Sequence, residues 1–92
     1  MPFFVYVLRS ESTGRRYVGH TNDVQRRLAE HNDRQAHPHK YTSKQAGPWT
    51  LVYHEAFENR SQAMRRERAL KSGQGRQWLD QKLGRASPPE AD

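Results

Sequence analysis

Two tyrosines, one arginine and one glutamate carry the side chains in this sequence that are best suited to chemistry. Tyr6 ends a Phe-Val-Tyr tripeptide, and Tyr17 begins a Tyr-Val-Gly tripeptide near the start of the chain. Arg27 offers a planar fork of donors that matches a phosphate group, and Glu67 offers a carboxylate. Phenols, a guanidinium and a carboxylate that meet at one surface are suited to hydrolysis of a phosphodiester bond.

The two tyrosines are weak evidence when taken alone. A tyrosine on a strand is more often an amphipathic core residue than a catalyst. Gly19 lets another group approach the backbone closely, but a glycine at a strand end is also typical of a bulge. The interpretation of Tyr6 and Tyr17 therefore depends on the residues that follow them on the helices.

Arg27 and His31 lie on the same side of a predicted helix as its apolar residues. Val24 and Leu28 mark the buried side of this helix. At about 100° per residue, Arg27 and His31 fall beside Leu28, while Arg26 points the opposite way. The periodicity therefore directs Arg27 and His31 toward the sheet. The alternative is that Arg27 lies along the surface, with its stem packed and its charged head in water.

Glu67 lies within the apolar stripe of another predicted helix. Ala63, Met64 and Leu70 define that stripe. A carboxylate in such a position must be paired, protonated or bound to a cation, because an isolated buried charge is very costly. The structural alternative is an ion pair with Lys71, since glutamate before lysine is the favourable order on a helix. Such a pair normally lies on the outer face, so it explains the pairing better than the position.

The sequence predicts the element order strand, strand, helix, strand, helix, helix. Aromatic and β-branched residues indicate strands at residues 3–8, 16–20 and 50–57. Capping residues and helical periodicity indicate the three helices. The first helix runs from a cap at Thr21 or Asn22 to about Arg34, the second from a cap at Ser61 to residues 72–73, and the third over residues 76–83 with Trp78, Leu79 and Leu83 on its inner side.

This order implies an α+β fold with a small three-stranded, mostly antiparallel sheet flanked by helices. Residues 50–57 are apolar on both faces, which predicts that this strand is central in the sheet. Residues 35–49 contain two prolines and one glycine and are predicted to form a loop. We expect one domain over residues 1–84 and a disordered tail over residues 85–92.

The composition limits the classes of function. Of the 92 residues, 33% are hydrophobic, 28% are charged and none is cysteine, which excludes disulfides and thiolate zinc sites. His31, His37 and His39 make only a weak zinc hypothesis, because no fourth ligand is evident. The first apolar run ends at Arg9, far short of a membrane helix. We therefore expect a cytoplasmic protein with no membrane partner.

Positive charge is concentrated in one segment of the chain. The net charge is +6, and residues 60–76 contain six basic residues against one acidic residue. Clustered positive charge attracts nucleic acids through phosphate contacts and counterion release, whereas a solvated helix face is the structural alternative. The predicted nucleic-acid contacts are His20, Arg65, Arg66, Arg68 and Lys71.

The tripeptides at residues 4–6 and 17–19, together with Arg27, His31 and Glu67, resemble the GIY-YIG endonuclease superfamily. Each tripeptide alone is weak evidence for this family, but the joint spacing of the tripeptides with Arg27 and Glu67 is strong evidence. The resemblance covers residues 3 to about 83 and is closest to the small stand-alone bacterial branch, which is a single catalytic domain.

The resemblance implies a three-stranded sheet and one divalent metal, usually Mg²⁺ and otherwise Mn²⁺, held by Glu67. It implies that Tyr6 and Tyr17 lie side by side at the reaction centre and that Arg27 holds the scissile phosphate. One tyrosine would then deprotonate or polarise the attacking water, and His31 could relay the proton. The sequence does not decide which tyrosine acts.

Some residues depart from the family pattern. Phe4 stands where the family's opening tripeptide has glycine, and His20 follows the second tripeptide where other branches often carry lysine or serine. The asparagine that many relatives carry on the last helix has no clear match.

The expected function is that of a metal-dependent endonuclease acting on DNA, in repair or recombination structures. The first alternative is a non-catalytic nucleic-acid-binding module on the same scaffold. A protein-interaction domain ranks last, because the charge excess on residues 60–76 favours a polyanion.

Overall fold

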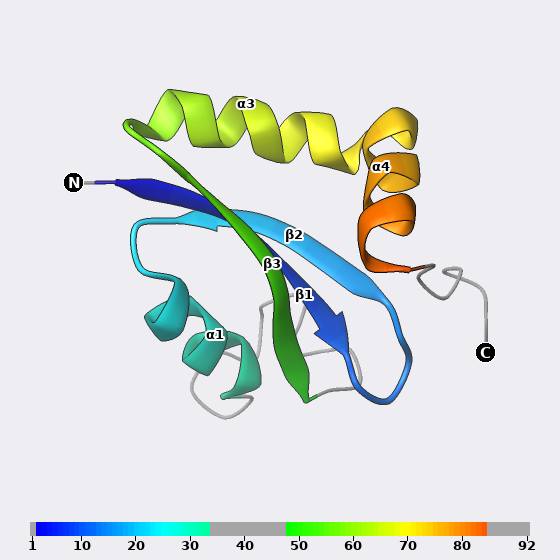
Figure 1. Cartoon of the computed structure of the whole chain (residues 1–92). Coiled ribbons are helices and arrows are strands. Elements are labelled where there is room, and N and C mark those ends of the chain that lie inside the picture. The colour runs from blue at the N-terminus through cyan, green and yellow to red at the C-terminus, as the bar shows by residue number, and fades with distance from the viewer. Residues whose placement is uncertain (1, 34–47, 85–92) are drawn as a thin grey trace.

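The computed structural model describes residues 2–33 and 48–84, and the predicted α+β order of elements is confirmed (Figure 1). The strands are β1 (Phe3–Ser10), β2 (Arg16–Thr21) and β3 (Trp49–Phe57), and the helices are α1 (Val24–Asn32), α3 (Arg60–Lys71) and α4 (Gly73–Leu83). The predicted tail, and the predicted loop up to residue 47, lie outside the described residues. Within the described ranges, each helix is too short and too polar to cross a bilayer.

The three strands form one antiparallel sheet in the order β2-β1-β3. The prediction that the third strand is central was wrong, because β1 takes that place. The run from Val5 to Leu8 is at most 1% exposed, which is typical of a strand covered on both faces. In β3, exposed residues such as His54 and Ala56 alternate with half-buried ones, as in an edge strand with one covered face.

Helices cover both faces of the sheet (Figure 1). On one face, Val5, Val7 and Val18 pack with Ala63 and Leu70 of α3 and with Leu79 of α4. On the other face, Tyr6 and Leu8 pack with Trp49 and with half-buried Val24 and Leu28 of α1. Because side chains alternate along a strand, β1 supplies Val5 and Val7 to one core and Tyr6 and Leu8 to the other.

The N-cap of helix α1 lies one residue after Asn22 and two after Thr21, the two predicted caps. Asp23 is the N-cap, and its side chain accepts a hydrogen bond from the backbone N–H of Arg26 at 3.0 Å. The hydroxyl of Thr21 instead accepts from the N–H of Asp23 and fixes the turn that precedes the helix. The helix ends at Asn32, and the predicted end at Arg34 falls outside the described residues.

The other two helices, in contrast, begin earlier than predicted. Asn59, not Ser61, caps α3 by accepting from the N–H of Gln62 at 3.0 Å. Ser72 caps α4, so this helix starts at Gly73 rather than at Arg76. Serine and asparagine oxygens at these positions satisfy N–H groups that a helix start leaves without partners.

Two residues that were predicted to face inward are largely exposed. Met64 on α3 is 41% exposed, and Trp78 on α4 is 37% exposed. Ala63, Leu70 and Leu79 fill the space between these helices and the sheet, each at most 1% exposed. The apolar stripe of α3 is therefore narrower than the sequence predicted.

Candidate active site

The two tyrosines meet on the α1 face of the β1–β2 hairpin. Tyr6 pairs with Gly19 across the strands, and its ring lies 6.3 Å from the ring of Tyr17. A Cβ atom at position 19 would lie 2.6 Å from the hydroxyl oxygen of Tyr6 and 3.1 Å from the ring of Tyr17. Glycine is therefore required at position 19, because the Tyr6 ring occupies the place of a side chain.

His31 joins the tyrosine pair from α1. Its ring is 2% exposed, and its Nε2 atom is hydrogen-bonded to the hydroxyl of Tyr6 at 2.8 Å. The His31 ring lies 4.9 Å from the ring of Tyr17 and 5.8 Å from that of Tyr6. Burial and the neighbouring Tyr17 raise the pKa of Tyr6 to about 12, so Tyr6 is a neutral phenol at physiological pH.

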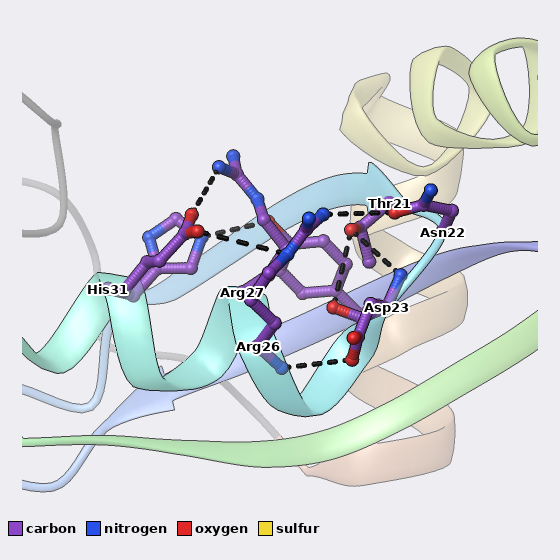
Figure 2. Close-up of polar contacts among 8 residues, drawn as sticks. Thr21, Asn22, Asp23, Arg26, Arg27 and His31 are labelled. Carbon is purple, nitrogen blue, oxygen red and sulfur yellow. Dashed lines mark hydrogen bonds and ion pairs between the residues drawn. The ribbon is translucent and has the colours of Figure 1, made fainter.

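Arg27 is half-buried on α1, whereas Arg26 is exposed, as the helical periodicity predicted. Figure 2 shows the polar contacts of these two arginines along α1. One terminal nitrogen of Arg27 donates to Glu30 at 2.9 Å, while its Nε atom is buried without a hydrogen-bond partner among the described residues. Arg26 donates instead to Asn22 at the helix start. Arg27 thus holds a buried Nε donor without a well-formed hydrogen bond. Burial alone would lower the pKa of Arg27, but its guanidinium lies beside the Tyr6 hydroxyl, which raises that pKa.

Glu30 is a site residue that the sequence reasoning missed. It pairs with Arg27 across three residues of α1 and also lies 3.8 Å from Arg26. The spacing of an acid three residues after an arginine on a helix was the available signal. Because Glu30 accepts from only one nitrogen of Arg27, it orients the guanidinium without using all of its donors.

Glu67 lies on α3, with a side chain that is 20% exposed. One carboxylate oxygen is hydrogen-bonded to Nδ1 of His20 at 2.6 Å, and the other accepts from Lys71 at 2.8 Å. Burial alone would raise the pKa of Glu67, but Lys71 and His20 together outweigh burial and lower it. Glu67 is therefore ionised at neutral pH. The predicted pair with Lys71 is present, and His20 adds a second partner.

Glu67 approaches the tyrosines from the other face of the sheet. Gly19 lies on the tyrosine face of β2, so the next residue, His20, points to the α3 face. Strand β2 is an edge strand of the sheet, so side chains from the two faces can extend toward one another around that edge. Burial is the main cause of the raised pKa of Tyr6, and the negative charge of Glu67 also raises it.

The predicted nucleic-acid contacts on α3 separate into paired and unpaired cations. Arg66 donates to both carboxylate oxygens of Glu55, at 2.9 and 3.0 Å, and covers the ring of Trp78. Lys71 is held by Glu67. Arg65 and Arg68 are exposed and form no ion pair within the described part of the chain. Arg66 is therefore occupied by a structural contact.

The donor chemistry at Glu67 fits a hard divalent cation such as Mg²⁺ or Mn²⁺. The carboxylate is ionised, and Mg²⁺ needs few protein ligands because it keeps several waters. Lys71 has a half-exposed side chain, so its ammonium group can leave the carboxylate oxygen without disturbing the core. No group of three or more potential ligands occurs among residues 2–33 and 48–84, and His37 and His39 lie outside these ranges.

Comparisons with known proteins agree with this arrangement. The family model described as the GIY-YIG catalytic domain matches residues 2–80. A UPF0213 protein of Halobacterium salinarum is 48% identical over 67 residues, which are 73% of this chain and 82% of the relative. A UPF0213 protein of Streptococcus agalactiae is 42% identical over 71 residues, which are 77% of this chain and 76% of the relative.

A solved structure shows the same fold. The solution NMR structure of a UPF0213 protein from Bacillus halodurans matches with a TM-score of 0.52 and 35% sequence identity. The match covers 91% of this chain and 87% of that one. The chain therefore belongs to the GIY-YIG family, a family of nucleases, and its relatives are small UPF0213 proteins.

Proposed function

We propose that this protein is a divalent-metal-dependent endonuclease that hydrolyses phosphodiester bonds in DNA, in structures that arise in repair or recombination. Membership of a nuclease family supports the reaction type. The net charge of +6 supports a nucleic-acid substrate. The proposal assigns the scissile phosphate to Arg27, the attacking water to the tyrosine pair, and the metal to Glu67.

The buried Nε atom of Arg27 is the observation that carries this proposal. It has no hydrogen-bond partner among the described residues, and a buried donor without a partner is costly. A phosphate oxygen would satisfy it with a charge-assisted hydrogen bond. Because Glu30 already holds another nitrogen of Arg27, the guanidinium is oriented before a phosphate binds.

Each side chain then has one role in hydrolysis. Arg27 binds non-bridging oxygens of the phosphate and offsets their charge. A tyrosine oxygen accepts a hydrogen bond from water while the water oxygen bonds to phosphorus and the bond to the leaving oxygen breaks; the attacking water gives up one proton to solvent, and the leaving oxygen takes one from solvent. Glu67 would hold the metal, and Mg²⁺ when bound supplies charge neutralisation at the phosphate and the leaving oxygen.

We assign the water to Tyr17 rather than to Tyr6. The Tyr6 hydroxyl is already hydrogen-bonded to His31, and its side chain is 1% exposed. Burial and the neighbouring Tyr17 raise the pKa of Tyr6 to about 12, which makes the buried phenol a poor proton acceptor. Tyr17 is half-buried, so its side chain as a whole is the more exposed of the two. Tyr6 and His31 then position Tyr17 through ring packing.

Replacement of each tyrosine by phenylalanine tests this assignment. Tyr17→Phe should slow single-turnover DNA nicking by about 100-fold, because it removes the oxygen that orients the water. Tyr6→Phe should slow nicking by about tenfold or less, because it removes a positioning contact with His31. A larger loss of rate from Tyr6→Phe than from Tyr17→Phe would assign the attacking water to Tyr6 instead.

Nicking of a supercoiled plasmid by the purified protein tests the proposed function directly. Conversion to nicked circles should require Mg²⁺ or Mn²⁺ and should stop with EDTA. Glu67 is itself an anion, so only a cation that it binds can neutralise charge on the phosphate. A panel of duplex, flap, junction and single-stranded DNA, with matched RNA, identifies the substrate. Nicking that continues in EDTA would overturn metal dependence.

One observation favours a non-catalytic nucleic-acid-binding module as the second candidate. Both oxygens of Glu67 are engaged by the protein itself, one by His20 and one by Lys71. A binding module predicts salt-sensitive DNA binding without strand scission under any metal condition. The plasmid assay separates the two candidates, because only the endonuclease changes the topology of the DNA.

A further inference from the structure

Helix α3 presents two different flanks to the rest of the molecule. Ala63 and Leu70 define its buried line. On one side of this line Glu67 contacts His20 of β2, and on the other side Arg66 contacts Glu55 of β3. The helix thus has a β2 flank next to the candidate active site and a β3 flank at the opposite edge of the sheet.

Helical geometry places Arg60, Met64, Arg68 and Lys71 on the β2 flank. At 100° per residue, Arg60 and Lys71 fall beside Glu67, and Met64 and Arg68 follow them toward the outer surface. Arg65 falls on the β3 flank, where it lines a shallow hollow with Phe57. We call the four residues of the β2 flank the α3 track.

The cations of the two flanks differ in how they are engaged. On the track, Arg60 and Arg68 are exposed and form no ion pair within the described residues, and Lys71 contacts Glu67 alone through a half-exposed side chain. On the β3 flank, Arg66 is tied to Glu55 and stacked on Trp78. Arg65, on the β3 flank, is also exposed without an ion pair among the described residues, so two of the three unpaired arginines of α3, Arg60 and Arg68, lie on the flank next to the candidate active site.

The length of the track suits a nucleic-acid strand. The twelve residues from Arg60 to Lys71 extend about 16 Å along the helix axis from the first Cα to the last, which equals the rise of about five nucleotides in a duplex strand. Glu67 lies between these two ends, so cations flank the carboxylate on both sides along the axis. Met64, 41% exposed, adds a flexible apolar contact between the cations.

We propose that the α3 track binds the DNA backbone on both sides of the scissile phosphate. The inference rests on the proposed function, since it places the reacting phosphate beside Glu67. It separates the basic residues of α3 by role: Arg60, Arg68 and Lys71 contact phosphates, whereas Arg66 stabilises the fold and Arg65 lies away from the DNA. The occupant is a phosphodiester backbone, which complements the unpaired cations.

Two double variants with the same loss of charge test the track. Arg60→Gln/Arg68→Gln removes the two unpaired track cations. The matched control, Arg65→Gln/Lys82→Gln, removes two cations from the β3 side, where Lys82 lies over the rings of Tyr53 and Trp78. Circular dichroism and thermal unfolding verify that both variants fold.

The measurement is DNA binding by fluorescence anisotropy, in EDTA so that no cleavage occurs, between 50 and 200 mM salt. The track variant should bind more weakly and should lower the slope of log affinity against log salt by about two, since each phosphate contact contributes about 0.9. The control should keep the wild-type slope. Equal slope changes in both variants, or a change in the control alone, would overturn the track.

Together with the plasmid-nicking assay, this experiment separates failure of the track from failure of the proposed function. Wild-type protein that binds DNA but never nicks it contradicts the endonuclease, while the comparison of slopes still decides the track. Wild-type protein that nicks DNA while both variants keep the same slope contradicts only the track. Wild-type protein that does not bind DNA at 50 mM salt overturns the track and the choice of substrate together.

Discussion

Glu67→Gln should abolish metal-dependent nicking, with a loss of about 1,000-fold or more, which corresponds to about 4 kcal/mol of transition-state stabilisation. The amide has the size of the carboxylate but lacks the negative charge that a hard divalent cation requires. The fold should survive, because the amide can still hydrogen-bond to His20 and the replacement removes the ion pair with the half-exposed Lys71, and such pairs contribute about 0.5 kcal/mol. Single-turnover nicking with Mg²⁺ or Mn²⁺ measures the loss.

Glu58→Gln is the matched control for this experiment. Glu58 is exposed between β3 and α3, and the replacement is the same change of a carboxylate to an amide. It should leave the nicking rate within about twofold of wild type. Calorimetry adds a reading that does not depend on catalysis: Mn²⁺ binding should weaken for Glu67→Gln and persist for Glu58→Gln. Wild-type nicking by a folded Glu67→Gln variant would exclude Glu67 as the metal ligand.

The sequence predicted the fold correctly wherever the spacing of apolar residues within a single element was enough to define that element. The aromatic and β-branched runs predicted the three strands, and the spacing of Val24 and Leu28 predicted which side of α1 is buried, including His31. The edge position of β3 was missed because apolar residues on both faces of a strand predict a central position. In the structure, the half-buried residues of β3 pack against the core beneath α3 and α4, and Tyr53 contacts Trp78 of α4.

The details of the site depended on contacts that no local pattern contains. The pair of Glu67 with Lys71 follows from spacing along α3, but the contact of Glu67 with His20 joins α3 to β2 and is not contained in either element. The pairing of Arg66 with Glu55 required knowledge that β3 runs beside α3, and it removed a cation from the predicted DNA contacts. Helix starts were misplaced by one to three residues, because several adjacent polar residues were able to cap and only backbone geometry chose among them.

Arg27→Lys should slow nicking by about 100-fold, although it keeps the positive charge. Lysine has one point charge in place of the planar fork, so it cannot pair with Glu30 and also present the buried Nε donor to a phosphate. Removal of a single preorganised donor from a site of this kind typically costs 10²–10³-fold in rate. Because the donor acts on charge that develops during the reaction, the loss should appear in the single-turnover rate more than in DNA affinity.

Arg26→Lys provides the control on the neighbouring residue. Arg26 has the same charge and lies on the same helix, but its side chain is 54% exposed and bonded to Asn22. Its replacement should change the nicking rate by less than about threefold. If both variants lost activity equally, the loss would reflect a general effect of replacing an arginine of α1 rather than the donor geometry of Arg27. A loss confined to Arg27→Lys would show that this buried nitrogen, rather than the charge alone, acts on the phosphate.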